Sequence, residues 1–263
     1  MNASPESSRS GRARRGHRPS AVVGLVLILL LAFVPSAAIG VAQEEPSGVE
    51  VGGVTVLPPD AEVGGAGIAE WDARLWQWSI TLPEASNPSF NPDAGMCGYG
   101  QFGPVFFLPP SYTPEPVTME CTVPEGTAIF VSVAASGCTS VEEPPFFGSN
   151  EEELRACAEE DFAGFTDLEI TINGELVPEL GSYQTSTPLF TLNFGEDNFY
   201  GLEPVVAYSV ATSQSIIIAP PAPGEYEIVA SGAYPADDVT FASTIRLVVE
   251  APTVNPPSAT PQA

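Results

Sequence analysis

The chain has 263 residues, of which 44% are hydrophobic, and it carries 33 acidic side chains against 8 basic ones, a formal net charge of −25. Beyond residue 42 it contains no histidine and no lysine, and its only basic side chains are Arg74, Arg155 and Arg246. That part of the chain therefore excludes Ser-His-Asp and Cys-His catalysis, histidine-ligated zinc, Schiff-base lysines and P-loop lysines, and its acidity argues against nucleic acid or anionic lipid as a partner.

The first 42 residues have the pattern of an export signal. A basic stretch from Arg9 to Arg18 precedes the apolar run Ala21–Val34, and Pro35 and small residues lead to Ala42. This pattern predicts a signal peptide that is cleaved before Gln43. The apolar stretch is also long enough to span a bilayer, so an uncleaved anchor, with the membrane as a partner, stays the alternative. In both cases we expect the remaining chain to be extracellular or at the cell surface.

The next segments are predicted to be a lead-in and a helix. Residues 43–65 are acidic and then rich in Gly, Pro and Val, which predicts a flexible lead-in with at most an edge strand at Val51–Leu57. A helix near 67–81 follows, because apolar residues recur there at three- and four-residue spacing on one stripe. The stripe consists of Ile68, Trp71, Leu75, Trp78 and Leu82, whereas Trp76 falls on a different face.

From residue 105 onward, short β-branched or aromatic runs alternate with turn residues, which is typical of strands. The predicted strands are Val105–Leu108, Val117–Val123, Thr127–Ala135, Leu168–Ile172, Leu176–Leu180, Leu189–Phe194, Val205–Val210, Ser215–Ala219, Glu225–Ser231 and Thr240–Glu250. Asn173-Gly174 predicts a type I′ hairpin turn. In the last strand one face reads Phe241, Ser243, Ile245, Leu247 and Val249.

A second helix near 150–163 interrupts the strands, and Ser149 and Glu152 have the spacing of a capping box at its start. Together the elements predict a mainly β fold, a single β-sandwich of immunoglobulin-like or jelly-roll-like type over residues 66–250 with two short helical insertions. The Pro/Ser/Thr-rich residues 251–263 predict a disordered tail.

The four cysteines, Cys97, Cys121, Cys138 and Cys157, all lie in the part that we expect to be exported, and they predict two disulfides. Of the three possible pairings we favour Cys97–Cys121 and Cys138–Cys157, because each closes a short loop. A zinc site of four thiolates is the alternative, although the chain has no C-x2-C pair.

Three segments carry a resemblance to known proteins: Trp71 with Trp76-Gln77-Trp78, Cys97 with Gly100-Gln101 and Gly103–Leu108, and Cys121–Phe130. In these segments the chain resembles a family of secreted bacterial proteins that share a Trp-rich helix, a GQ-x-GPV-aromatic-aromatic-L strand and a C-T-V-P-x-G turn. The similarity covers residues 70–250. It implies a single exported domain, and it implies no activity and no site residues.

The Trp-rich helix offers candidate ligand-binding residues. Exposed aromatic rings are the usual platforms for sugars, because the apolar face of a sugar stacks on a planar ring. Trp76 and Trp71 are the candidates for this role. The competing interpretation is that Trp71 and Trp78 fill the core beside the sheet, since both lie on the apolar stripe.

Carboxylates offer a second kind of site. A glycosidase needs two of them and no histidine, and Glu70, Asp72 and Glu120 are candidates by local context. With so many acids in the chain most must be solvated surface groups, and we assign no catalytic residue.

Calcium is the third kind of site. Asp197 and Asn198 lie in one oxygen-rich loop and Asp237 and Asp238 in another, and Ca²⁺ favours such loops, although neither has EF-hand spacing. Plain polar turns are the alternative for both loops. We expect no other cofactor.

The sequence thus favours a secreted, non-enzymatic β-sandwich protein that serves as a binding or structural module for glycan or protein. The alternative is a carboxylate-dependent glycan-active enzyme, which requires two buried acids that face one cleft near Trp76.

A nucleotide is not an expected partner, because the glycine-rich Gly98–Gly103 precedes a strand and no lysine follows it. Without histidine, we also expect the stability to be nearly flat between about pH 6 and 8.

Overall fold

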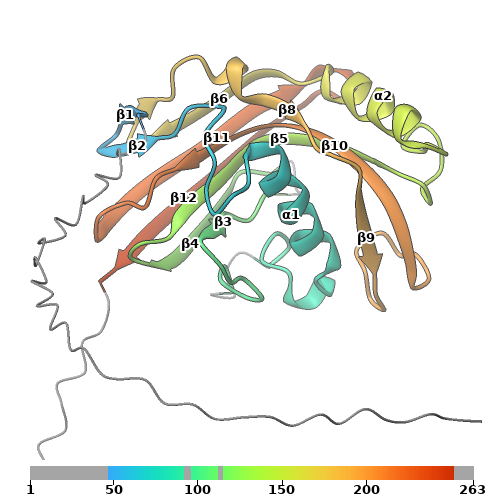
Figure 1. The fold of residues 1–263 in the computed structure, drawn as a ribbon, viewed down its shortest axis with the longest axis horizontal. Coiled ribbons are helices and arrows are strands. Elements are labelled where there is room, and N and C mark those ends of the chain that lie inside the picture. Colours follow the sequence, from blue (N-terminus) through green and yellow to red (C-terminus); the bar gives the residue numbers. More distant parts are fainter. Residues whose placement is uncertain (1–46, 92–95, 112–114, 252–263) are drawn as a thin grey trace, which may run out of the picture. The chain divides into compact units, whose positions relative to one another are not determined.

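The computed structural model describes residues 47–91, 96–111 and 115–251, which form two β-sheets and two α-helices (Figure 1). The elements are β1 (Val49–Val51), β2 (Val54–Val56), α1 (Ile68–Thr81), β3 (Val105–Phe107), β4 (Val117–Pro124), β5 (Ala128–Thr139), α2 (Glu151–Phe162), β6 (Thr166–Ile172), β7 (Glu175–Leu176), β8 (Gln184–Ser186), β9 (Phe190–Phe194), β10 (Val205–Ile218), β11 (Gly224–Tyr234) and β12 (Val239–Glu250), with short 3₁₀ turns at Glu84–Ser86, Leu180–Tyr183 and Pro235–Asp237. The signal or anchor predicted for residues 1–42 and the tail beyond Ala251 lie outside the described residues.

The first sheet has the order β1-β2-β10-β5-β3 and is organised by the 14-residue strand β10. One edge of β10 pairs with β5, and the other pairs in turn with β9, β8 and β2. The sequence predicts two strands here, Val205–Val210 and Ser215–Ala219, separated by the mostly polar residues 211–214. They form one strand because both faces of its middle are covered: Val210 packs with α2, whereas Ala211 packs with residues of α1. Figure 1 shows the two helices on opposite sides of β10.

The second sheet has the order β4-β12-β11-β6-β7, with β4 parallel to β12 and the other pairs antiparallel. The turn between β6 and β7 is formed by Asn173 and Gly174, whose φ angles of 50° and 80° suit the predicted type I′ turn. The Asn173 side chain also joins neighbouring elements. Its Nδ2 donates to the Gly52 carbonyl (2.7 Å), and its Oδ1 accepts from the Glu227 N–H (2.8 Å).

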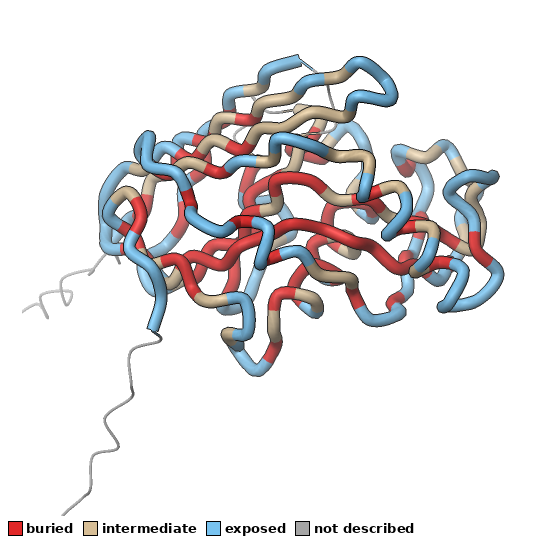
Figure 2. Tube along the Cα trace, turned by 90° about the horizontal axis from the view of Figure 1, so that it is seen from above, coloured by how far each residue is buried: buried red, intermediate tan, exposed pale blue. Residues whose placement is uncertain are grey.

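The two sheets pack against each other around one main core, and the apolar stripe of α1 joins that core. Ile68, Trp71, Leu75 and Trp78 are buried, as their spacing predicts. Figure 2 shows the buried stretches running along the long strands. The prediction of a mainly β sandwich with two short helical insertions is therefore confirmed.

Residues 49–56 are more ordered than the flexible lead-in that their composition predicts, although β2 lies within the edge strand predicted at Val51–Leu57. They form the hairpin β1–β2, and Val56 pairs with Ile218 at the edge of β10. The side chains of Val51, Val54 and Val56 are buried in the main core. The hairpin is ordered because it covers apolar surface and extends a sheet edge that would otherwise be unpaired.

Both disulfides have the predicted pairing, Cys97–Cys121 and Cys138–Cys157, and the second ties α2 to β5. The start of α2 is one residue later than the predicted capping box. Asn150, with φ −153°, is the N-cap, and its Oδ1 accepts from the Glu153 N–H (3.1 Å). The Glu153 carboxylate in turn accepts from Ser149, and these hydrogen bonds lower its pKa.

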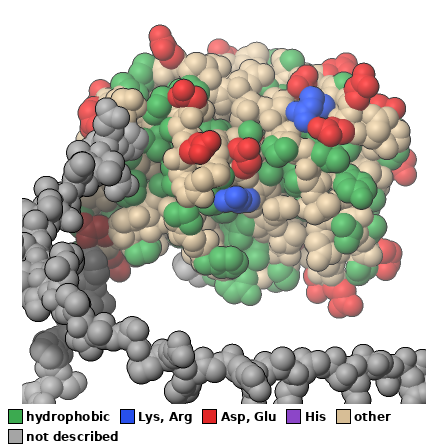
Figure 3. Space-filling view, in the orientation of Figure 1, with side chains coloured by type: hydrophobic (Ala, Val, Ile, Leu, Met, Phe, Trp, Pro, Cys, Tyr) green, Lys and Arg blue, Asp and Glu red, His purple; other side chains and the backbone are tan. Residues whose placement is uncertain are grey.

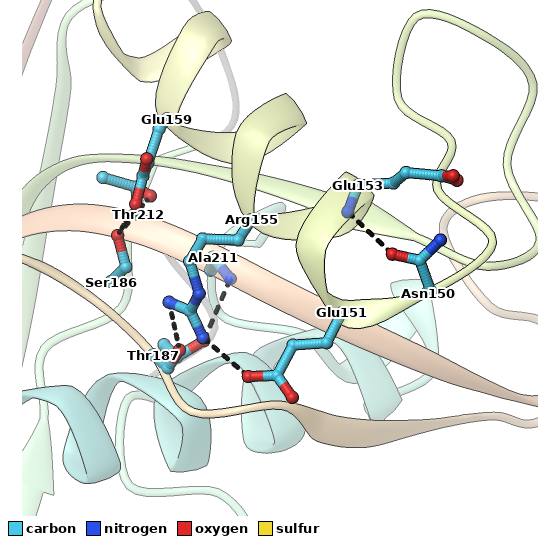
Figure 4. Close-up of polar contacts among 9 residues, drawn as sticks. All are labelled: Asn150, Glu151, Glu153, Arg155, Glu159, Ser186, Thr187, Ala211 and Thr212. Carbon is cyan, nitrogen blue, oxygen red and sulfur yellow. Dashed lines mark hydrogen bonds and ion pairs between the residues drawn. The ribbon is translucent and has the colours of Figure 1, made fainter.

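Polar contacts hold the other side of α2 against β8 and the residue that follows it, Thr187 (Figure 4). Arg155 donates to the Thr187 carbonyl (3.1 Å) and pairs with Glu151 (3.0 Å). Ser186 donates to Glu159 (3.1 Å). The disulfide and these contacts together fix α2 on the outer face of the first sheet. Within the described ranges, no helix is both long and apolar enough to cross a membrane.

Candidate functional site

A cavity of about 380 Å³ lies between the two sheets, beside α1. Its volume falls within the range of roughly 300–1,000 Å³ that is usual for small-molecule sites. Its walls come from α1, β5, β11, β12 and the segment that follows β3. The lining residues are Leu75, Trp76, Ser79, Leu108, Pro109, Pro110, Ser111, Val131, Ser132, Val133, Ala134, Ala135, Phe165, Ile228, Ala230, Val239, Phe241, Ser243 and Ile245.

The lining is apolar with a few hydroxyls. None of the described residues that line the cavity is charged, and the side-chain polar groups are those of four serines and Trp76. Burial of apolar surface contributes about 25 cal/mol per Å², so a ligand that fills this space gains affinity mainly from its apolar area. The serines limit hydrogen bonding to a few directions.

Ser243 is the unusual member of this lining. It lies in β12 between Phe241 and Ile245, and all three line the cavity, so the alternation of the strand directs the Ser243 side chain into it. Only 8% of Ser243 is exposed, and its Oγ has no hydrogen-bond partner within the described residues. A buried polar group without a partner costs about 1–3 kcal/mol. A ligand or a water molecule in the cavity would remove that cost.

Trp76 lies at the same cavity, half-buried, and its Nε1–H is also buried without a partner in the described part of the chain. One edge of its ring packs on the backbone of Gly137 in β5. The predicted sugar platform is therefore not a free surface ring: Trp76 offers part of its indole to an apolar cavity. Its role in ligand binding stays a prediction.

Trp71 occupies a different environment. It is 5% exposed, its Nε1 donates to the carbonyls of Val63 (3.0 Å) and Ala66 (3.1 Å), and its ring contacts Phe107 and lies under the Arg74 guanidinium. Trp71 is not part of the cavity lining. The competing interpretation, that Trp71 and Trp78 fill the core, is confirmed.

Asp72 is the one acidic residue in the described ranges that is buried. It lies one helical turn before Trp76, and burial raises the pKa of its carboxyl from 3.8 to about 7, while the nearby Ser213 hydroxyl lowers it by less. Neither carboxyl oxygen has a partner in hydrogen-bonding geometry among the described residues. The expectation of flat stability between pH 6 and 8 therefore needs correction. It rested on the absence of histidine, but the buried carboxyl of Asp72 titrates in that window.

The other carboxylate candidates lie on the surface. Glu70 is exposed and accepts from the Gly67 N–H at the start of α1 (3.1 Å). Glu120 is exposed and lies 3.7 Å from Arg246. Burial raises the pKa of Glu142, but this residue is half-buried and outside the cavity lining. The described residues thus contain no second buried acid to pair with Asp72.

The candidate calcium ligands lie in two turns. The side chain of Asn198 is occupied by its own loop: its Nδ2 donates to the carbonyls of Gly195 and Leu202, and its Oδ1 accepts from the Leu202 N–H. Asp197 and Asp238 both have positive φ, and Asp237 and Asp238 are exposed. Among the described residues, no group of three or more His, Cys, Asp or Glu side chains is close enough together to hold a metal ion.

No protein-family model matches the chain, and no curated protein sequence matches it. Among solved structures, "Structure of PbICP-C in complex with falcipain-2" is similar to 56% of this chain and 100% of that chain, with 12% identity and a TM-score of 0.24. "Solution Structure of Amebosin" is similar to 50% of this chain and 95% of that chain, with 13% identity and a TM-score of 0.15. Similarities at this level assign no function.

Proposed function

We propose that this chain is an exported, non-enzymatic binding module that takes a small apolar molecule into the cavity between its two sheets. The observation that carries the proposal is the 380 Å³ space with apolar walls, which the core leaves unfilled. Small-molecule sites are usually concave and mainly apolar, with a few polar groups. A cavity of this kind, bordered by both sheets and α1, is therefore most simply a binding site.

The frame around the cavity supports a preformed site. The disulfide Cys138–Cys157, a long strand shared by several partners and the contacts of α2 hold the first sheet, and Cys97–Cys121 ties β4 of the second sheet to the segment before β3, so a ligand would not have to order these parts. Binding to a preorganised pocket avoids the entropic cost of ordering loops and side chains. Export, with a location outside the cell or at its surface, is part of this proposal.

The composition of the walls favours an apolar ligand over the glycan that the sequence suggests. A sugar ring carries several hydroxyls, and each needs a partner when it is buried, whereas the described side chains of this lining offer only four serines and one indole N–H. Binding of glycan or protein elsewhere on the surface stays a prediction, as does calcium binding at the two acidic turns. The glycan-active enzyme also stays an alternative, with Asp72 as the one buried acid among the described residues.

The test measures binding of a neutral fluorescent probe, N-phenyl-1-naphthylamine, to the full oxidised chain as it is secreted. We expect saturable binding with enhanced probe emission. Ala230→Leu should fill the cavity and weaken the binding at least tenfold, because the added side chain occupies the ligand's space. Ala156→Leu is the matched control, since Ala156 is exposed on α2 and outside the lining.

Two results would overturn the proposed function. One is a probe that does not bind to the folded wild-type chain. The other is equal binding by Ala230→Leu and Ala156→Leu, which would place the probe outside the cavity. A circular-dichroism spectrum and an unfolding curve for each variant would show that both are folded.

A further inference from the structure

We infer that the ligand of this cavity is an uncharged molecule with a hydrogen-bond acceptor, such as an ester, ketone or amide carbonyl, and that Ser243 is the residue that holds this acceptor. The inference rests on the proposed function, because it specifies the ligand class of the same site. It adds what the apolar volume alone does not decide, namely the polarity of the ligand and its orientation.

The charge distribution makes the ligand neutral. No lysine, arginine, aspartate or glutamate lies among the described residues of the lining. An ionised group that entered would lose its hydration without gaining a counter-ion, which is costly in an apolar space. Acidic side chains are spread over the face seen in Figure 3 and would repel an approaching anion such as a fatty-acid carboxylate.

The geometry of β12 makes Ser243 the anchoring group. Its neighbours on the same face, Phe241 and Ile245, form apolar walls, so the Ser243 hydroxyl is a single polar point within that part of the lining. The hydroxyl is nine-tenths buried and has no partner that the described residues supply. A ligand atom that bonds to it would recover a hydrogen bond that the ligand-free core lacks.

The donor–acceptor direction of that hydrogen bond is inferred from Trp76. A hydroxyl can donate or accept, but an indole N–H can only donate. The Trp76 Nε1–H is the second unpartnered buried polar group on a residue of this lining. A ligand that accepts hydrogen bonds can pair with the Ser243 hydroxyl and with an indole N–H alike, and a carbonyl oxygen is a compact acceptor of this kind.

The experiment measures displacement of N-phenyl-1-naphthylamine by four ligands with the same octyl length: octane, methyl octanoate, octanoate and octylammonium. We expect methyl octanoate to bind most tightly, and both ions to bind less tightly than octane. Ser243→Ala should lower the ratio of ester affinity to octane affinity by between about twofold and tenfold, the fold-change of one net hydrogen bond. Ser231→Ala is the control, because Ser231 lies on β11 outside the lining and should leave the ratio unchanged.

The outcomes separate this inference from the proposed function. If octane and the ester bind equally, or if either ion binds most tightly, the inference fails while the apolar site stands. If Ser243→Ala and Ser231→Ala show the same ratio of ester affinity to octane affinity, Ser243 does not bind the ligand's acceptor. If neither the probe nor any of the four ligands binds, the proposed function fails, and the inference fails with it.

Discussion

The indole of Trp76 rests on the backbone of Gly137, so closely that a Cβ added at Gly137 would lie 2.8 Å from Cη2 of the ring. The contact brings α1 against β5 beside the cavity, and only glycine permits it. Because Gly137 does not have a positive φ, the requirement is for space rather than for an unusual backbone conformation. The position of the Trp76 ring, and with it one wall of the cavity, thus depends on the absence of a Cβ atom at Gly137 in β5.

Gly137→Ala should therefore displace the Trp76 ring. We expect a loss of about 1–3 kcal/mol in the free energy of unfolding, as is usual for overpacking, together with a change in Trp fluorescence. Urea unfolding measures the first and the emission spectrum the second. Gly181→Ala is the control, because an added Cβ there meets nothing within 4 Å and the backbone is not strained. Equal stability of the two variants would show that the ring moves without cost.

Asp72 should make the stability depend on pH. Between its unfolded pKa near 3.8 and its folded pKa of about 7, the folded state keeps a proton that the unfolded state has released. Stability should therefore fall as pH rises from about 4 to 7 and level off above that, by roughly 1.4 kcal/mol per pH unit at most and about 4 kcal/mol in total.

Asp72→Asn removes this titration and keeps the shape of the side chain. Urea unfolding at several values between pH 5 and 8 should show the wild-type chain losing stability relative to Asp72→Asn as the pH rises. If the two curves run parallel across this range, Asp72 does not titrate there and its carboxyl is better solvated than its burial implies.

Ser243→Ala should stabilise the ligand-free chain. The substitution removes a buried hydroxyl that has no partner in the described structure, and such a group costs about 1–3 kcal/mol. We expect a higher melting temperature for the variant without ligand, together with the weaker ester preference described above. A lower melting temperature would indicate that a water molecule already satisfies this hydroxyl in the ligand-free protein.

The disulfide Cys138–Cys157 should control the attachment of α2. Its cysteines are 19 residues apart, and replacing both with alanine should cost about 3 kcal/mol. Hydrogen exchange should show the largest loss of protection in α2, because the helix would then be held by non-covalent contacts alone: its packing, the polar contacts of Arg155 and Ser186, and the hydrogen bonds that Asp161 accepts from Ser136 and Tyr234. Removal of Cys97–Cys121 is the comparison, and it should leave α2 protected.

The side chain of Asn173 should stabilise the fold beyond its role in the hairpin turn, because it bonds to Gly52 and Glu227. Asn173→Gly keeps the positive φ that the turn requires but removes the side-chain bonds to Gly52 and Glu227. We expect a loss of about 1–3 kcal/mol in the free energy of unfolding, since each lost bond contributes about 1 kcal/mol. A variant as stable as the wild type would show that water replaces both bonds.

Much of the local structure follows from the sequence alone. The three- and four-residue spacing of Ile68, Trp71, Leu75 and Trp78 determines the position and buried face of α1, because that spacing returns side chains to one side of a helix. The Asn173-Gly174 pair determines a hairpin, because its residues tolerate positive φ. The disulfide pairing follows from the short loops that Cys97–Cys121 and Cys138–Cys157 close.

Only the tertiary structure shows which faces of the strands and helices are covered, and therefore which side chains are buried. The polar middle of β10 continues as a strand because α1 and α2 cover its two sides, which no local pattern encodes. Asp72 is buried by elements distant in sequence, so its pKa could not be read from its neighbours in the chain. The alternation of β12 places Ser243 on an apolar face, but only the packing of both sheets shows that its hydroxyl faces a cavity and lacks a partner. Sequence periodicity determines which way a side chain points, whereas its solvation depends on whatever the rest of the chain places opposite it.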